Sequence, residues 1–204
     1  MRARHGAVVR LEPDACACPA AAAAFGFKPL PEGLASGRGL VGFGIVTDPA
    51  VGQEMFRGMP RLTSGSIGGI VACPLSQAPR TPDVVVLEGP PENLMWVALA
   101  DLNRAGGARR HGDTAVLQAT CVDAVVIPHV QQRLNFSLGC YGCREATDLG
   151  PDETVLGFPG QRLAAILVAL EALNEKAVPR SRAKQVYKTL MCPKEVEDAG
   201  KDAH

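Results

Sequence analysis

The second half of the chain alternates short apolar runs with longer segments of helical periodicity. The segment 83–88 contains a short continuous apolar run between Asp83 and Glu88, as in a strand covered on both faces, and 135–138 and 153–158 predict two more strands. A proline and a glutamate open a predicted helix over 91–102. Leucine and isoleucine recur on one stripe of 160–176, which predicts an amphipathic helix.

Two further elements lie between these segments. The residues 114–119 predict a strand, and 123–132 predict a helix. Pro128 falls inside that helix and has no backbone N–H to donate, so a kink is expected there.

The first half is richer in glycine and proline, and its elements are shorter. Cys18 precedes a proline and a run of alanines that predict a helix over 19–25. The residues 40–47 predict a strand with small residues on one side, and 69–73 predict another. Between them, an aspartate cap followed by proline predicts a helix over 48–57.

Alternation of strands and helices predicts an α/β fold, with a mixed α+β arrangement as the variant, and excludes an all-β barrel. A chain of 204 residues is the usual size of one domain. We expect a single compact domain over 1–178 and a surface or flexible tail over 179–204, where basic residues follow Pro179.

The composition argues against nucleic-acid binding, a membrane span and secretion. The 21 basic side chains are balanced by 21 acidic ones, so the surplus of positive charge that nucleic-acid binding requires is missing. The most apolar stretch, 163–173, is too short to span a membrane and contains Glu171. The N-terminus is not typical of a secretion signal, and we therefore expect a cytoplasmic protein.

Seven cysteines are the most informative feature of the composition. Their odd number and the expected cytoplasmic location argue against a disulfide framework. Clustered thiols in a reducing compartment more often indicate metal, cluster or redox chemistry.

The pair Cys140 and Cys143 forms a CxxC motif in a glycine-spaced turn, which allows two thiolates to bind one centre. Cys18 lies at a predicted helix start, where the helix dipole favours a thiolate. Cys121 and Cys140 each end a predicted strand and are expected to face one crevice. The sequence therefore predicts a site of four thiolates at Cys18, Cys121, Cys140 and Cys143, with Cys73 or Cys16 as a substitute.

An iron–sulfur cluster, expected as [4Fe–4S], suits single ligands arranged around one pair better than zinc, which usually takes two close pairs. Zinc and a metal-free protein remain the alternatives. A redox dithiol at Cys140 and Cys143 is a third interpretation, although the residues after the motif do not predict the helix of a thioredoxin-like site.

The block 138–148, followed by 152–153 and 157–160, resembles domain-of-unknown-function family 169, the ArCR group. Upstream blocks at 18–26, 82–86 and 118–121 are similar to the same family, so the resemblance runs from about residue 7 to 176. It implies a cysteine-bearing cytoplasmic protein of microbial metabolism that is suspected of holding an iron–sulfur centre.

This chain differs from the family pattern in two ways. Family members commonly begin with an extra strand and helix, so the expectation is either that the start of this chain is misassigned or that its fold is trimmed. Many relatives have asparagine at the place of Cys143, which implies that Cys18, Cys121 and Cys140 are the core ligands.

The sequence contains no evident catalytic acid–base set, and it predicts no reaction. We expect electron transfer, redox sensing or an accessory role together with a redox or metabolic partner protein. The alternative is a zinc-stabilised or metal-free module that binds a small molecule or a partner.

Overall fold

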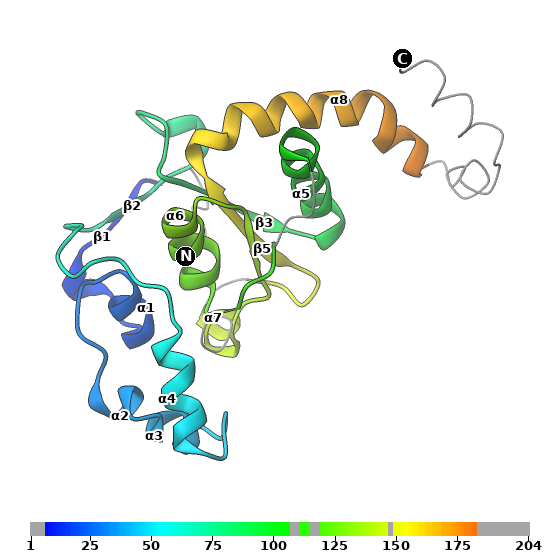
Figure 1. The fold of residues 1–204 in the computed structure, drawn as a ribbon. Coiled ribbons are helices and arrows are strands. Elements are labelled where there is room, and N and C mark those ends of the chain that lie inside the picture. Colours follow the sequence, from blue (N-terminus) through cyan, green and yellow to red (C-terminus); the bar gives the residue numbers. More distant parts are fainter. Residues whose placement is uncertain (1–6, 107–110, 115–118, 147–148, 183–204) are drawn as a thin grey trace.

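The computed structural model describes residues 7–106, 111–114, 119–146 and 149–182. These residues form a mixed α/β domain with two small antiparallel sheets, as the sequence predicts (Figure 1). The predicted strand at 114–119 falls largely on residues outside the described part of the chain, as does most of the predicted tail.

The described residues contain five strands, which are short and bounded by loops or helices. They are β1 (Val9–Leu11), β2 (Ile70–Ala72), β3 (Val84–Gly89), β4 (Asn135–Ser137) and β5 (Thr154–Pro159). The α-helices are α1 (Pro19–Ala24), α2 (Glu32–Ala35), α3 (Arg38–Gly42), α4 (Pro49–Arg57), α5 (Pro91–Ala105), α6 (Ile127–Gln131), α7 (Tyr141–Ala146) and α8 (Leu163–Arg182). One π-helical turn, η5 (Val122–Val126), runs directly into α6, and three 3-10 turns are η2 (Pro13–Ala15), η3 (Leu75–Gln77) and η6 (Gly160–Arg162).

Strand β5 is the centre of the larger sheet, which has the order β3-β5-β4 with both pairs antiparallel. All six residues of β5 are buried, because its two faces are covered by different layers. Leu156 and Phe158 pack with helices α5 and α8, whereas Val155 contacts Ala124 of η5 on the other face. The strand predicted at 153–158 is therefore confirmed.

Strand β3 lies at the edge of this sheet and is not covered on both faces as its apolar run predicts. Val86 remains 47% exposed, and Glu88 is exposed as well. An edge strand needs only one buried face, so a continuous apolar run does not distinguish it from a central strand.

A second core joins the first half of the chain to η5 and α6. Phe25, Leu40 and Phe56 come from the N-terminal helical region and pack with Val122 and Ile127. The segment η5–α6 therefore lies between the two cores, and Figure 1 shows it between the sheet and the N-terminal helices.

The strand predicted at 40–47 is wrong: this segment contains the end of α3 and a turn. Gly44 takes a positive φ of 70° and donates to the carbonyl of Val41, while Ile45 donates to the carbonyl of Leu40. These two bonds form a Schellman motif, which ends a helix at a glycine. Leu40 is the one buried residue in 40–47, so a strand over this segment would have no covered face.

The predicted kink at Pro128 is present as a widened helical turn. Pro128 cannot donate to the carbonyl of Ala124, and the helix passes through the π-turn η5 immediately before it. Helix α8 also contains a proline, Pro179, but continues to Arg182, beyond its predicted end at residue 176.

Helix and strand approach each other most closely at Gly157. A Cβ atom at this position would lie 1.8 Å from the carbonyl oxygen of Ala124. Only glycine leaves room for η5 to rest on β5 at this distance, since a Cβ atom needs more than 3 Å from any neighbour.

We expect Gly157→Ala to lower the free energy of unfolding by about 3 kcal/mol or more, because backbone must move in both packed elements. Gly89→Ala is the matched control, since no atom lies within 4 Å of its added Cβ. Urea denaturation should show a change within about 1 kcal/mol for the control. Equal stability of the two variants would contradict this account of the packing.

Candidate functional site

Three segments bring the predicted cysteine ligands into one region. Cys18 precedes α1, Cys121 precedes η5, and Cys140 precedes α7, whose first turn contains Cys143. Burial is the largest cause that raises the pKa of the Cys121 thiol, and charge repulsion from Cys18 and from Cys143 adds to it. The hydrogen bond to Cys143 is the largest cause that raises the pKa of Cys140, and Cys121 contributes in the same direction. Cys121 therefore lies within electrostatic range of Cys18, Cys140 and Cys143.

Two of these positions differ from the predicted ones. Cys121 begins a helical segment and is not the last residue of a described strand. Cys140 lies between β4 and α7, close to the predicted strand end. Because the sheet is antiparallel, these two cysteines approach each other through helix starts and not through the shared end of parallel strands.

The CxxC motif lies on the first turn of a helix, which the sequence did not predict. The carbonyl of Cys140 accepts the N–H of Arg144 at 3.0 Å, and its Sγ accepts the N–H of Cys143 at 3.2 Å. Cys140 therefore caps α7 in the way that serine or aspartate caps other helices. This is the arrangement that a redox dithiol would use.

Arg144 holds this short helix in place. Its guanidinium donates to the carbonyl oxygens of Leu138 at 2.5 Å, Gly150 at 2.7 Å and Glu153 at 3.1 Å. These acceptors lie before α7 and beside the start of β5, so one side chain joins both ends of the loop to the cysteine helix. This role of Arg144 was not predicted from the sequence, in which the one sign of it is an arginine directly after the CxxC motif.

The hydrogen bond between the two thiols of the motif shifts their pKa values in opposite directions. The bond from the Cys140 thiol is the largest cause that lowers the pKa of Cys143, and burial opposes it; with the smaller lowering by the hydroxyl and backbone of Thr120, the pKa is about 5. The same bond raises the pKa of Cys140, because that thiol is the donor. The pair therefore holds one proton between two sulfurs, with the thiolate at Cys143.

Cys121 is the most buried thiol of the group. Burial is the main cause that raises its pKa to about 12. In the metal-free protein it is therefore neutral at pH 7, and it must lose a proton to bind any metal.

The remaining cysteines have other surroundings. Cys16 packs against the N-terminal core, and burial raises its pKa. Cys73 lies just after β2 in the lining of a cleft and is half-buried. Cys192 lies outside the described residues.

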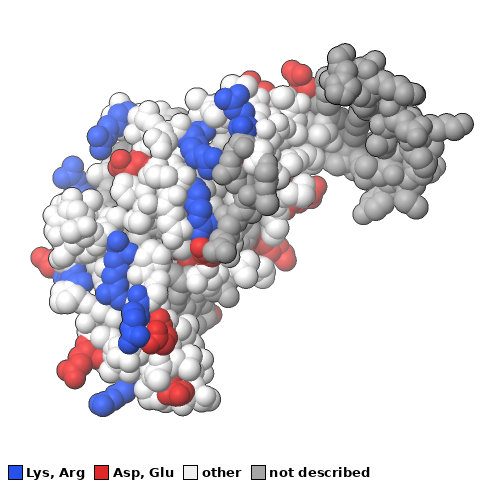
Figure 2. Space-filling model, viewed as in Figure 1, with Lys and Arg blue, Asp and Glu red and all other residues white. Residues whose placement is uncertain are grey.

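Within the described ranges, no three side chains of His, Cys, Asp or Glu have the arrangement that holds a single metal ion. No helix in the same ranges is both long and apolar enough to cross a membrane. Figure 2 shows basic groups separated by neutral and acidic ones over much of the viewed face.

Comparison with known proteins gives a family and one relative of unknown role. A family model described as Uncharacterised ArCR matches residues 1–169. An uncharacterised protein of Methanocaldococcus jannaschii is 31% identical over 159 residues, which are 78% of this chain and 67% of that protein. No solved structure matches the chain.

We expect the alkylation rate of Cys143 in the reduced, metal-free protein to reach its plateau by about pH 6.5, because a thiol with a pKa of about 5 is almost fully ionised there. An ordinary thiol, with a pKa of about 8.5, keeps gaining reactivity up to about pH 9. Cys121 should stay unreactive throughout this range. Iodoacetamide labelling followed by peptide mass spectrometry measures both residues.

Thr120→Val is the matched variant, because it keeps the shape of the side chain and removes the hydroxyl that faces Cys143. The plateau should move to higher pH in this variant. A rate at Cys143 that still rises tenfold per pH unit between about pH 7 and 8 would show that its thiolate is not stabilised.

Proposed function

We propose that this chain, which belongs to the uncharacterised ArCR family, binds an iron–sulfur cluster and acts in electron transfer, redox sensing or an accessory role. The ligands in this proposal are four thiolates: Cys18, Cys121, Cys140 and Cys143. The proposal is supported by the electrostatic coupling of Cys121 to Cys18, Cys140 and Cys143, which come from three separate segments, although, within the described part of the chain, these thiols do not have the arrangement that holds a single metal ion.

The donor set fits such a group. Iron–sulfur clusters take cysteine thiolates as ligands, commonly four for [4Fe–4S], and ligands from one short motif are combined with others from distant parts of the chain. Cys140 and Cys143 provide the short motif, whereas Cys18 and Cys121 come from helix starts. Thiolates also select iron–sulfur clusters over hard oxygen-seeking ions.

Other residues and the burial of Cys121 would support the four cysteine ligands. Arg144 fixes α7 against the start of β5, which keeps Cys140 and Cys143 at a constant separation. Thr120 stabilises the thiolate of Cys143, and the burial of Cys121 excludes water from one side of the group. When bound, the cluster would supply one-electron redox chemistry.

Cys18 gives the group an exposed side. Burial raises the cost of placing charge at Cys121, whereas no such burial surrounds Cys18. An electron partner would therefore approach from the start of α1.

We expect the protein produced and purified without oxygen to contain roughly four iron and four sulfide per chain and to absorb broadly near 400 nm. Cys140→Ser and Cys121→Ser should each lose most of the iron and the colour. Cys73→Ser is the matched control, because Cys73 is half-buried but has no part in the four-thiol group. Iron and sulfide analysis with an absorbance spectrum measures all four proteins.

Absence of iron and sulfide from anaerobic wild-type protein would overturn the proposal. Equal loss in Cys73→Ser would also overturn this ligand set, since the effect would then follow from general destabilisation or from Cys73 acting as a ligand. Circular dichroism of each variant shows whether it folds.

A redox dithiol at Cys140 and Cys143 is the second candidate, and the capping of α7 by Cys140 favours it. In this function the two thiols would form one disulfide and release two protons and two electrons. The electrons would pass to a disulfide of a partner, which would be reduced to two thiols.

We expect metal-free protein in a glutathione redox buffer to form a disulfide that joins Cys140 to Cys143, with a midpoint potential of roughly −180 to −270 mV. Peptide mapping after alkylation identifies the linked residues. Thr120→Val should change the midpoint, because it removes a hydroxyl that favours the reduced thiolate. Disulfides that join other cysteines, or none at any potential, would exclude this second function.

A further inference from the structure

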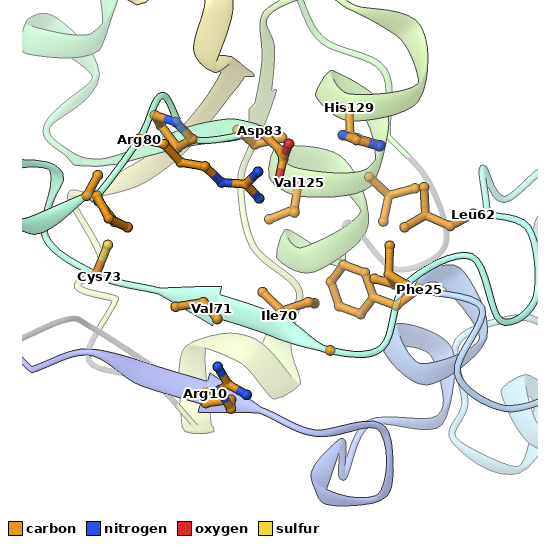
Figure 3. Close-up of a pocket in the computed structure, with 17 residues that line it drawn as sticks. Arg10, Phe25, Leu62, Ile70, Val71, Cys73, Arg80, Asp83, Val125 and His129 are labelled. Atoms are coloured by element: carbon orange, nitrogen blue, oxygen red, sulfur yellow. The ribbon is translucent and has the colours of Figure 1, made fainter.

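A cleft lies between the two-stranded sheet and the segment η5–α6, beside the loop that joins β2 to β3 (Figure 3). Its volume is about 480 Å³, within the range of pockets that hold small organic molecules. The four thiols proposed as cluster ligands do not line it. The cleft is therefore a separate feature of the molecule.

The floor of the cleft is apolar. Leu62, Val125 of η5 and Ile70 of β2 are partly buried side chains that pack against the N-terminal core. All three line the cleft, so they leave an apolar surface open toward it. Such a floor favours a ligand with an aliphatic or aromatic body.

The rim carries positive charge on opposite walls. Arg10 projects from β1, and Arg80 reaches in from the β2–β3 loop, as Figure 3 shows. His129 of α6 lies on a third side, and Asp83 is the acidic residue among those that line the cleft. Among the lining residues, two guanidinium groups thus stand against one carboxylate, and Glu12 lies beside Arg10 outside the lining.

Neither arginine is occupied by a strong ion pair within the described residues. The guanidinium of Arg10 lies 3.9 Å from the carboxylate of Glu12, at the limit of contact, and both side chains are largely exposed. Exposed pairs of this kind contribute little energy. Arg80 has no ion pair in this part of the chain, so both groups are available to an anion.

We infer that this cleft binds an organic acid: a carboxylate on an apolar aliphatic or aromatic body. The apolar part lies on Leu62, Ile70 and Val125, and the carboxylate lies at the rim between Arg10 and Arg80. Guanidinium groups suit this contact because they donate two parallel bonds to a carboxylate. Asp83 disfavours a second negative charge beside Arg80, which selects a monoanion.

Three probes of one chain length test this assignment: octanoate, octan-1-ol and octylammonium, each titrated into the full chain by calorimetry. Octanoate should bind once per chain and more tightly than the alcohol, and octylammonium should bind weakest. Arg80→Gln and Arg10→Gln should each weaken octanoate binding about tenfold and leave octan-1-ol unchanged. Arg38→Gln is the control, because Arg38 is an exposed arginine of α3 that does not line the cleft.

A second measurement locates the ligand. Cys73 lines the cleft, so saturating octanoate should slow its alkylation severalfold and leave the rate at Cys143 unchanged. The assignment is overturned if octanoate does not bind, if octylammonium binds as tightly, or if Arg38→Gln weakens octanoate as much as Arg80→Gln does. Unchanged alkylation of Cys73 at saturating octanoate would overturn it as well.

Discussion

The close approach of η5 to β5 at Gly157 is the constraint on which the other parts depend. Because no side chain separates Ala124 from this strand, the widened helical turn rests directly on the centre of the sheet. The opposite side of the same segment packs against the N-terminal core through Val122 and Ile127. One helical segment therefore joins both cores, and its position fixes what lies at each of its ends.

Cys121 stands at the beginning of this segment, and His129 stands near its end. The first belongs to the thiol group, and the second lines the cleft. The two proposed sites thus share a rigid element while using different residues. Burial of the segment explains why the Cys121 thiol is neutral, whereas the cleft opens where the β2–β3 loop leaves that segment uncovered.

The two candidate functions of the thiols compete for the same sulfur atoms. A cluster requires both Cys140 and Cys143 as thiolates bound to iron, whereas a disulfide requires both sulfurs to be free of metal. The capped helix α7 and the anchoring by Arg144 suit either function, because both need a fixed distance between these sulfurs. Cys18 and Cys121 distinguish them, since only a cluster uses these two residues.

The sequence by itself determined the mixed α/β class, the strand at 153–158, the kink at Pro128 and the cysteines of interest, because these follow from local periodicity, from a missing N–H and from residue type. Tertiary structure decided the rest. The segment 40–47 holds a helix end and a turn because Gly44 closes a Schellman motif and only Leu40 enters the core. The helix at the CxxC motif depends on Arg144, which donates hydrogen bonds to carbonyl groups as far along the chain as Glu153. The cleft depends on the pairing of β1 with β2, two strands that are far apart in the sequence. Contacts between residues distant in sequence carry no local pattern, so periodicity and spacing did not reveal them.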